Sequence, residues 1–420
     1  MRNLVALRDS SLSLSSSGTS AVAVDFNIGT GELLVLTKSG QVNIIDVESD
    51  QHVVSTTEQS WDLSKSGDNG EDHTWFDIVA LRGNGSIVCI SRAGLVISIL
   101  LDLVSGRWSQ EVIVEGDVDG GIADAAWSPD QSRLVIVTNN DTILSMNSDW
   151  DVLEEVPLVE PRAPGTSLKL SWRGDGEHFA LQSVDSTTGS SNIRVYSNEL
   201  EVLATGRNIA DGPASVLKGV GRCVAFGTNG ALVAFPQERI KGKLQVAFIE
   251  KNGLRHGDFD LVLGELPKGY AKWSVTGLHW DLPSSLLAVE IRALREGQQE
   301  GTEEVGEKGP SLVQMYYRGN YHWYLKQQWI GSDLRILRFD RELSGRCYFS
   351  QEVTPAGINS GVVGVVGVPS LRIVDLSWDV VCNDTRDASV AVADGKAMLM
   401  TPLGFVTGPP PMSHSQLALP

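Results

Sequence analysis

The sequence predicts an all-β fold, and three observations support this. Short β-branched runs alternate with clusters of Gly, Asn, Asp and Ser. No long window shows the apolar spacing of an amphipathic helix. A turn pattern recurs along the chain at separations of 45 to 59 residues, and repeats of about 40–50 residues indicate a β-propeller. We therefore predict a seven-bladed, divergent WD40-like β-propeller, a repeat architecture that suits 420 residues better than a single core.

The expected strands are short runs of four or five apolar and β-branched residues, which fit a pleated surface. Examples in chain order are Leu33–Leu36, Ile87–Ile90, Leu134–Val137, Ile193–Tyr196, Gln245–Ile249 and Ser389–Ala393.

The repeated turn unit consists of a large apolar residue followed by a polar, often Gly-containing turn. The seven large residues are Phe26, Leu81, Trp127, Trp172, Phe226, Trp280 and Phe339. We expect them to anchor one blade each by packing between neighbouring blades, because a four-stranded blade cannot bury both faces alone. Trp378 follows Phe339 by only 39 residues and is assigned to the seventh unit.

Two polar segments interrupt the repeat. Glu48–Trp75 reads as a long surface loop, and Arg292–Ser311 reads as a mobile excursion inside the sixth blade. We expect the charges of the second segment to serve solvation rather than docking.

The composition argues against binding to polyanions. Lys and Arg number 34 and Asp and Glu number 52, which gives a net charge of −18. Phosphate backbones and anionic membranes both require clustered positive charge. Four cysteines without a CxxC pair, no signal-peptide pattern and no apolar run near 20 residues predict a soluble intracellular protein.

The sequence contains no recognisable catalytic or cofactor-binding motif. The nucleophile elbow, the phosphate-binding loop and the dinucleotide fingerprint are missing, and the seven histidines are dispersed. The sequence therefore predicts a protein-interaction platform that is not an enzyme and has no cofactor, metal or catalytic residues. A propeller enzyme that uses the central channel is the less favoured alternative.

Several strings resemble one known family. They are Met1–Leu4, Trp127–Gln131, Ser171–Gly176, Phe248–Gly257 and Gly319–Gln327. Together they resemble the N-terminal region of the largest, scaffolding subunit of the Elongator complex, the IKAP-type family, from residue 1 to about residue 330.

The resemblance implies a non-catalytic scaffold in the modification of C5 of the tRNA wobble uridine. The implied partners are a separate radical-SAM and acetyltransferase subunit, which holds the cofactors, a WD40 subunit, and a second propeller in the same full-length chain. Contact with tRNA is expected to be indirect, and the expected compartments are the cytoplasm and the nucleus. Residues 1–400 would form the first propeller, and residues 401–420 a segment leading toward the second one, which this chain lacks.

The predicted partner contacts lie in the two longest of these strings. Tyr321, Trp323 and Tyr324 crowd an expected strand on alternating faces, so one face must point outward. Asn252 and Gly253 are the second predicted contact. The competing interpretation is that these residues form an inner strand and a hairpin. An unrelated WD40-like platform and direct tRNA binding are the other functions left open.

Overall fold

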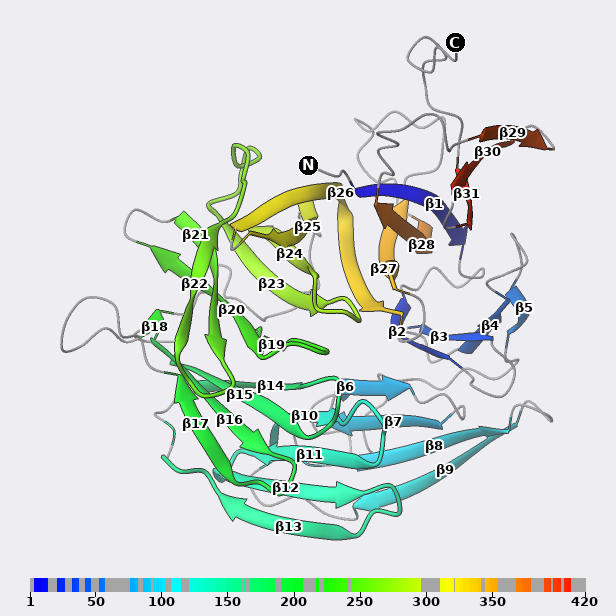
Figure 1. Cartoon of the computed structure of the whole chain (residues 1–420). Helices are drawn as coiled ribbons and strands as arrows, with labels where there is room; N and C mark the ends of the chain where they lie inside the picture. Colours follow the sequence, from blue (N-terminus) through cyan, green and yellow to red (C-terminus); the bar gives the residue numbers. More distant parts are fainter. Residues whose placement is uncertain are drawn as a thin grey trace.

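The computed structural model contains only β-strands as regular structure in the part of the chain that it describes (Figure 1). It describes residues 4–13, 21–26, 32–37, 42–46, 53–56, 76–81, 86–91, 94, 96–102, 107–114, 121–160, 162, 166–185, 190–206, 217–218, 223–239, 243–295, 310–320, 322–340, 344–353, 368–378, 389–393, 396–401 and 404–408. No helix among these residues is long and apolar enough to cross a membrane. The prediction of an all-β fold is confirmed.

Among the described residues, five sheets share one plan, in which four antiparallel strands pair in chain order. The first contains β2 (Ala21–Phe26), β3 (Leu33–Thr37), β4 (Val42–Ile45) and β5 (Val53–Thr56). The second contains β6 (Phe76–Leu81), β7 (Ser86–Ser91), β8 (Val96–Asp102) and β9 (Arg107–Val114). The third contains β10 (Ile122–Trp127), β11 (Arg133–Thr138), β12 (Thr142–Asn147) and β13 (Val152–Pro157). The fourth contains β14 (Thr166–Trp172), β15 (His178–Asp185), β16 (Ser190–Ser197) and β17 (Val202–Gly206), with β18 (Leu217–Lys218) also paired to β16. The fifth contains β19 (Ala225–Phe226), β20 (Leu232–Arg239), β21 (Lys243–Glu250) and β22 (Arg255–Asp260).

A larger sheet of seven strands follows, and one long strand holds it together. Its order is β23 (Lys272–Trp280), β24 (Leu286–Leu294), β25 (Pro310–Gly319), β26 (His322–Phe339), β27 (Arg346–Val353), β28 (Val368–Trp378) and β1 (Leu4–Ser13). The first part of β26, up to Ser332, pairs with β25, and the part from Ser332 onward pairs with β27. The sheet therefore consists of two four-stranded halves that share β26.

The outer strand of this sheet comes from the opposite end of the sequence. β1 pairs with β28 from Leu4 opposite Trp378 to Ser13 opposite Ser370. The Arg372 guanidinium also donates two hydrogen bonds of 2.6 Å to the Asp9 carboxylate. The N-terminal strand thus completes a sheet whose other strands follow residue 271.

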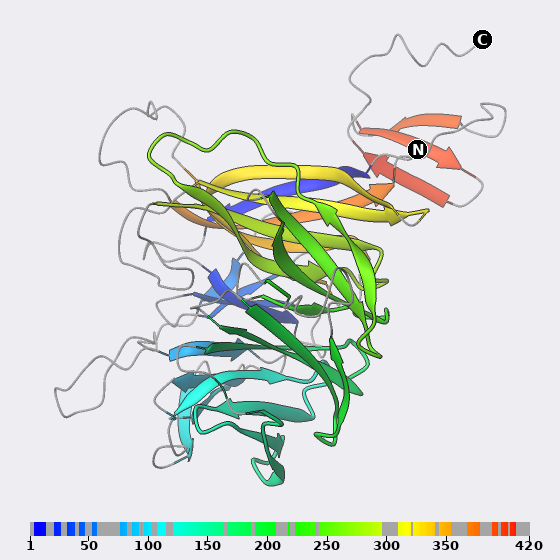
Figure 2. The same ribbon diagram turned by 90° about the vertical axis from the view of Figure 1, so that its left-hand side faces the viewer.

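A separate sheet of three strands follows β28 in the sequence. It contains β29 (Ser389–Ala393), β30 (Lys396–Thr401) and β31 (Gly404–Gly408), and Figure 2 shows it apart from the stacked sheets. β31 falls within residues 401–420, where the sequence predicts a connecting segment. The domain boundary at residue 400 and the number of seven blades remain predictions.

Each of the seven predicted anchor residues is the last residue of the first strand, in chain order and leaving β1 aside, of its sheet or half-sheet. They end β2, β6, β10, β14, β19, β23 and β26. Trp172, Phe226, Trp280 and Phe339 are buried, Trp127 is partly buried against Trp150, and the side chains of Phe26 and Leu81 lie outside the described residues.

Two anchor tryptophans make the same hydrogen bond to the preceding sheet. Trp172 Nε1 donates to the Ala126 carbonyl at 3.0 Å, and Trp280 Nε1 donates to the Ala225 carbonyl at 3.1 Å. In both cases the acceptor directly precedes the anchor of the neighbouring sheet. These two anchors therefore tie adjacent sheets by hydrogen bonds as well as by apolar contact.

The core consists of apolar layers between successive sheets. One layer joins Phe248 on β21 to Val289 on β24, and another joins Val135 on β11 to Phe179 on β15. Each layer removes apolar surface from water, and this burial stabilises the fold by about 25 cal/mol per Å². Cys223 is buried in the first of these layers.

Described strands extend into both segments that the sequence predicts as loops. β5 lies inside Glu48–Trp75 and pairs with β4, because its β-branched residues can extend the sheet. β24 continues to Leu294, which stays buried opposite Lys272, and β25 begins at Pro310. The predicted boundaries at Arg292 and Ser311 are therefore wrong, since these two residues pair with each other.

Candidate interaction surface

The hairpin β21–β22 and the strands β25 and β26 bring the two longest family-like strings into contact. Phe248 of the first string stacks on Trp323 of the second, with ring centroids 4.7 Å apart and planes 9° apart. The two strings are separated by more than 60 residues in the sequence. The structure therefore brings Trp323 of one predicted group against the hairpin whose tip holds Asn252 and Gly253. This region is here called the hairpin surface (residues 250–257, 317–320 and 322–326).

Trp323 lies inside this region rather than on its outside. It is partly buried and packs on Phe259 at 5.2 Å and on Trp280 at 5.7 Å between ring centroids. Its predicted role as a partner contact stays a prediction. Alternation along β26 turns this side chain toward the neighbouring sheet, where its large apolar area is best buried.

Tyr324 follows on the other face of β26. It is partly buried, and the Lys326 ammonium lies 5.8 Å from its ring centroid. The same ammonium lies 6.0 Å from the ring of Trp378, which contacts Tyr317 edge-on at 4.5 Å. Tyr324 thus belongs to a half-buried group of three aromatic rings with one cation. Tyr321 lies outside the described residues.

Asn252 and Gly253 form the tip of the β21–β22 hairpin. Asn252 is exposed, and its side chain accepts a hydrogen bond from Leu254 N at 3.0 Å. Gly253 is buried with a φ of +82°, and a Cβ added to it would lie 2.5 Å from the Thr205 carbonyl oxygen. Gly253 thus fits a left-handed turn pressed against β17, while Asn252 faces outward.

A chain of polar contacts crosses from the hairpin tip to β25. Arg318 donates to His256 Nε2 at 2.7 Å, and His256 Nδ1 lies 2.9 Å from Glu250 Oε1. Because a guanidinium has no acceptor, Nε2 accepts and Nδ1 carries the proton that it donates to Glu250. His256 and Arg318 were missed by sequence reasoning although both lie in or beside the strings that carry the resemblance.

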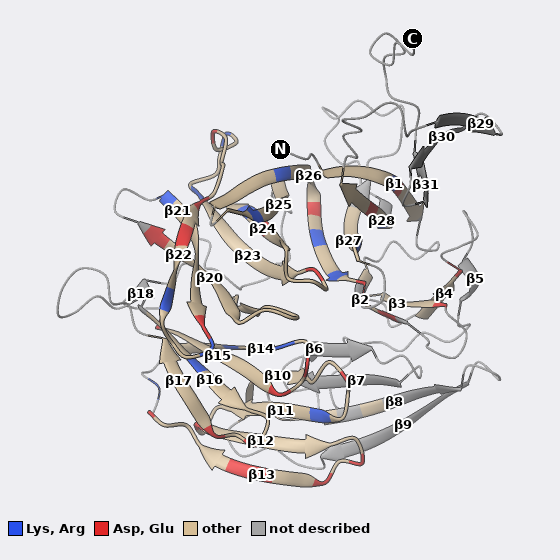
Figure 3. Cartoon of the chain, viewed as in Figure 1, with Lys and Arg blue, Asp and Glu red and all other residues tan. Residues whose placement is uncertain are grey.

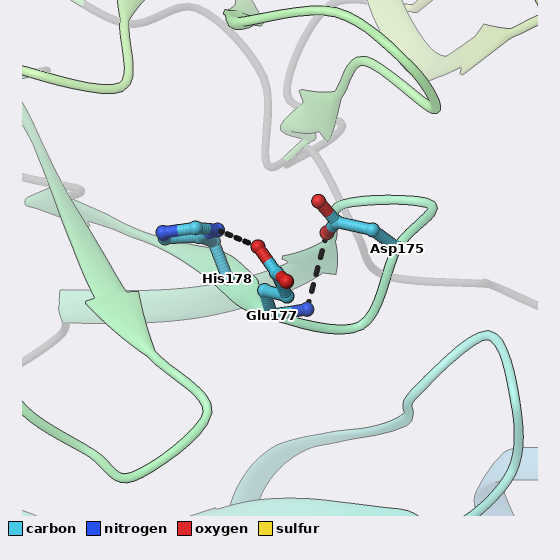
Figure 4. Close-up of side chains that lie close together, drawn as sticks. All are labelled: Asp175, Glu177 and His178. Carbon is cyan, nitrogen blue, oxygen red and sulfur yellow. Dashed lines mark hydrogen bonds and ion pairs between the residues drawn. The ribbon is translucent and has the colours of Figure 1, made fainter.

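Three side chains elsewhere approach one another as metal ligands do. Asp175, Glu177 and His178, in the β14–β15 turn, offer one ligand atom each within 4.8 Å (Figure 4). The Arg173 guanidinium lies 3.0 Å from Asp175, and the Glu177 amide donates to the same carboxylate at 3.1 Å. Both acidic residues are exposed. Contacts within the turn thus explain why these three side chains lie close together. With both acidic residues exposed, the three side chains fit a metal site poorly.

Comparison with known proteins identifies the family. The family model described as "ELP1 first N-terminal beta-propeller" matches residues 1–167 and 162–342. Elongator complex protein 1 of Rattus norvegicus is 28% identical over 367 residues, which cover 74% of this chain and 24% of the relative.

Two further relatives bear the same name or a putative form of it. The Xenopus laevis protein is 32% identical over 62% of this chain and 20% of its own length, and the Saccharomyces cerevisiae protein is 22% identical over 80% and 27%. The solved structure of U3-55K matches with a TM-score of 0.49 at 11% identity over 89% of this chain and 98% of that one. The chain spans about a quarter of the length of the curated relatives it matches. It belongs to the family of the first N-terminal β-propeller of ELP1, as the resemblance of its strings predicts.

Proposed function

We propose that the chain is a seven-bladed propeller. Five sheets have four strands in chain order, and the seven-stranded sheet divides at β26 into two four-stranded halves. β1 supplies the fourth strand of the last half, so the first and last units of the repeat would be held together by the pairing of β1 with β28. Radial stacking of such units buries both faces of each sheet.

We infer that this propeller serves as a non-catalytic scaffold in the Elongator complex. Buried carboxylates support this role because they bind neighbouring sheets to one another. Asp25 accepts from Arg338 at 2.6 Å, and Asp124 accepts from the Leu170 amide at 2.7 Å. Groups that could perform acid–base chemistry are thereby committed to holding the stack.

The complex would modify C5 of the tRNA wobble uridine through a separate radical-SAM and acetyltransferase subunit. The proposed partners are that subunit, the WD40 subunit and a second propeller of the same protein, in the cytoplasm and nucleus. The high net negative charge, −18, favours indirect rather than direct contact with tRNA.

The contact between the two family-like strings carries this proposal. It brings Arg318 next to His256 in the hairpin whose tip carries the exposed Asn252, while Tyr324 lies half-buried on the other face of β26. Aromatic and Arg side chains can supply much of an interface's binding energy. We expect the doubly substituted chain Tyr324→Ala, Arg318→Ala to co-purify at least 10-fold less with the radical-SAM subunit. Val262→Ala, at a residue 57% exposed and two positions beyond the end of β22, serves as the matched control.

Two outcomes distinguish the scaffold role from the choice of the hairpin surface as the contact site. If the unsubstituted chain does not co-purify with Elongator subunits, the scaffold role is contradicted. If the double variant assembles as well as Val262→Ala, the scaffold role stands and the hairpin surface is the wrong site. Mass spectrometry of the wobble uridine in tRNA from the same cells reports whether lost assembly also lowers modification.

A further inference from the structure

Two neighbouring sheets carry the same unusual hairpin. Asp149-Trp150-Asp151-Val152-Leu153 leads into β13, and Glu199-Leu200-Glu201-Val202-Leu203 leads into β17. Both read acid, large apolar residue, acid, Val, Leu, and they are offset by 199 − 149 = 50 residues. Each segment therefore occupies the same place in its sheet, at the start of the outermost strand.

The two hairpins also share their backbone. Asn147 N donates to the Asp151 carbonyl at 3.0 Å, and Ser197 N donates to the Glu201 carbonyl at 2.9 Å. The large apolar residue is left-handed in both, with φ of 71° at Trp150 and 58° at Leu200. A bulky side chain adopts this conformation at a cost and only where its surroundings hold it there.

The surroundings that hold these residues lie inside the molecule. Leu200 is 3% exposed within the apolar layer between the third and fourth sheets, and Trp150 packs edge-on against Trp127 at 5.7 Å. Turning the apolar residue inward leaves its two acidic neighbours outside. The four acids Asp149, Asp151, Glu199 and Glu201 are all exposed.

The aliphatic pair that follows is exposed as well. Val152 is 56% and Leu153 43% exposed, and Val202 is 39% and Leu203 48% exposed. Single exposed aliphatic residues are ordinary, but here an exposed pair recurs at the equivalent position of two adjacent sheets. We call these two segments, with Glu155, the acidic–aliphatic surface.

The fold does not require this composition. The β21–β22 hairpin makes the same turn, with Glu250 N donating to the Leu254 carbonyl at 2.8 Å and a left-handed residue at the equivalent position. There the left-handed residue is Gly253, and Lys251 and Arg255 flank the tip. Equivalent hairpins thus form with basic neighbours, so the turn does not require the repeated acids or the aliphatic pairs. Asp151 does accept a hydrogen bond from Asn147 Nδ2 at 3.1 Å within its own turn.

The two segments contain no basic residue, and the neighbouring Arg194 on β16 pairs with Glu160, which lies outside them. Residues 147–160 contain five acidic and no basic side chains, and residues 195–206 contain two acidic and no basic side chains. Figure 3 shows acidic but no basic colour along β13. The nearby Arg133 donates to the Asn198 carbonyl at 2.7 Å and so links the two sheets from within.

We propose that the acidic–aliphatic surface binds an extended segment of a protein partner in which Lys or Arg alternates with aliphatic residues. The acids attract the basic residues and repel phosphate, which disfavours nucleic acid and anionic lipid. The exposed Val–Leu pairs give the aliphatic residues of the partner segment an apolar surface on which to pack. An extended segment fits because, among the described strands, β13 pairs only with β12 and β17 only with β16, which leaves an edge open on each.

The test measures binding of a fluorescent 12-residue peptide of alternating Lys and Val to the 420-residue chain by anisotropy. A peptide of alternating Glu and Ser is the control ligand. We expect the Lys–Val peptide to bind and the variant Val152→Ser, Leu153→Ser, Val202→Ser, Leu203→Ser to bind it at least 10-fold more weakly. Val262→Ser with Ile330→Ser, at residues 57% and 68% exposed elsewhere, should bind as the unsubstituted chain does.

A second variant keeps the test valid if the fourfold Ser variant misfolds. Asp149→Asn, Glu155→Gln, Glu199→Gln, Glu201→Gln leaves the aliphatic residues in place, and we expect it to weaken binding and flatten its dependence on salt. Equal binding to this variant and to the unsubstituted chain overturns the proposal, as does equal loss in the Val262–Ile330 control. Self-association that the Val–Leu substitutions abolish also overturns it, because the occupant is then a second copy of the chain.

Discussion

At the scale of single residues, backbone conformation at a hairpin tip gives a sharp test of the structure. Gly253 and Gly269 both have positive φ, +82° and +90°, but only Gly253 lies against another strand. A Cβ at Gly253 would come within 2.5 Å of the Thr205 carbonyl, whereas nothing lies within 4 Å of one at Gly269. Gly269→Ala should lower the free energy of unfolding by about 1 kcal/mol.

Gly253→Ala should lower the free energy of unfolding by at least roughly 2 kcal/mol more than Gly269→Ala does, because the backbone at Thr205 must also move. Denaturant titration of both variants measures the difference. Equal losses would show that β17 does not approach the hairpin tip in solution.

Tyr316 allows a prediction about alkaline pH. Its hydroxyl donates to Gln314 Oε1 at 2.8 Å and accepts from Val262 N at 3.0 Å, and burial raises its pKa to about 12. The folded chain therefore holds this proton more tightly than the unfolded chain does. The resulting stability is fully present below pH 10 and is lost as the pH rises from about 10 to 12.

Ultraviolet titration of phenolate checks this. One tyrosine should ionise near pH 12 in the parent chain and be missing from Tyr316→Phe, whose stability should fall less steeply between pH 10 and 12. A parent chain without such a late-ionising tyrosine contradicts the buried placement.

At the scale of elements, β26 links two half-sheets, and its two faces should respond differently to substitution. Trp329 is 9% exposed and packs on Phe349 at 5.3 Å, whereas Ile330, the next residue, is 68% exposed. Trp329→Ala should lower the free energy of unfolding by about 3–5 kcal/mol. Ile330→Ala should change it by less than about 0.5 kcal/mol. Similar effects at both positions would mean that the register of β26 is wrong by one residue.

One feature of β26, its change of partner strand, could not be predicted from the sequence. Its strand character is visible in its residues, but the change of partner at Ser332 is not, because the alternation of side chains continues through it. The contact between His256 and Arg318 is equally hidden, since these residues are 62 positions apart and single-sequence patterns are local. The anchors were predictable because each repeats the same short local pattern at the end of a strand.

At the scale of the whole molecule, the pairing of β1 with β28 should control stability. Removing residues 1–13 exposes the edge of β28 and the partners of Leu4 in its apolar cluster. We expect a chain that starts at residue 14 to melt at least several degrees lower than the parent or to aggregate, since unpaired edges promote association.

A synthetic peptide of residues 1–13 provides the complementary test. Added in excess to the truncated chain, it should restore the thermal transition toward that of the parent, as expected for a ligand that binds only the folded state. A peptide of the same composition in scrambled order is the control. Unchanged melting after truncation would contradict the pairing.

Asp9 and Arg372 are 363 residues apart in the sequence and share two hydrogen bonds. At synthesis rates of about 5–20 residues per second, β1 emerges from the ribosome roughly 20–70 s before β28 does. During that time its edge has no native partner, and chaperones are suited to shield such a strand. The last step of assembly thus waits for translation of almost the entire propeller.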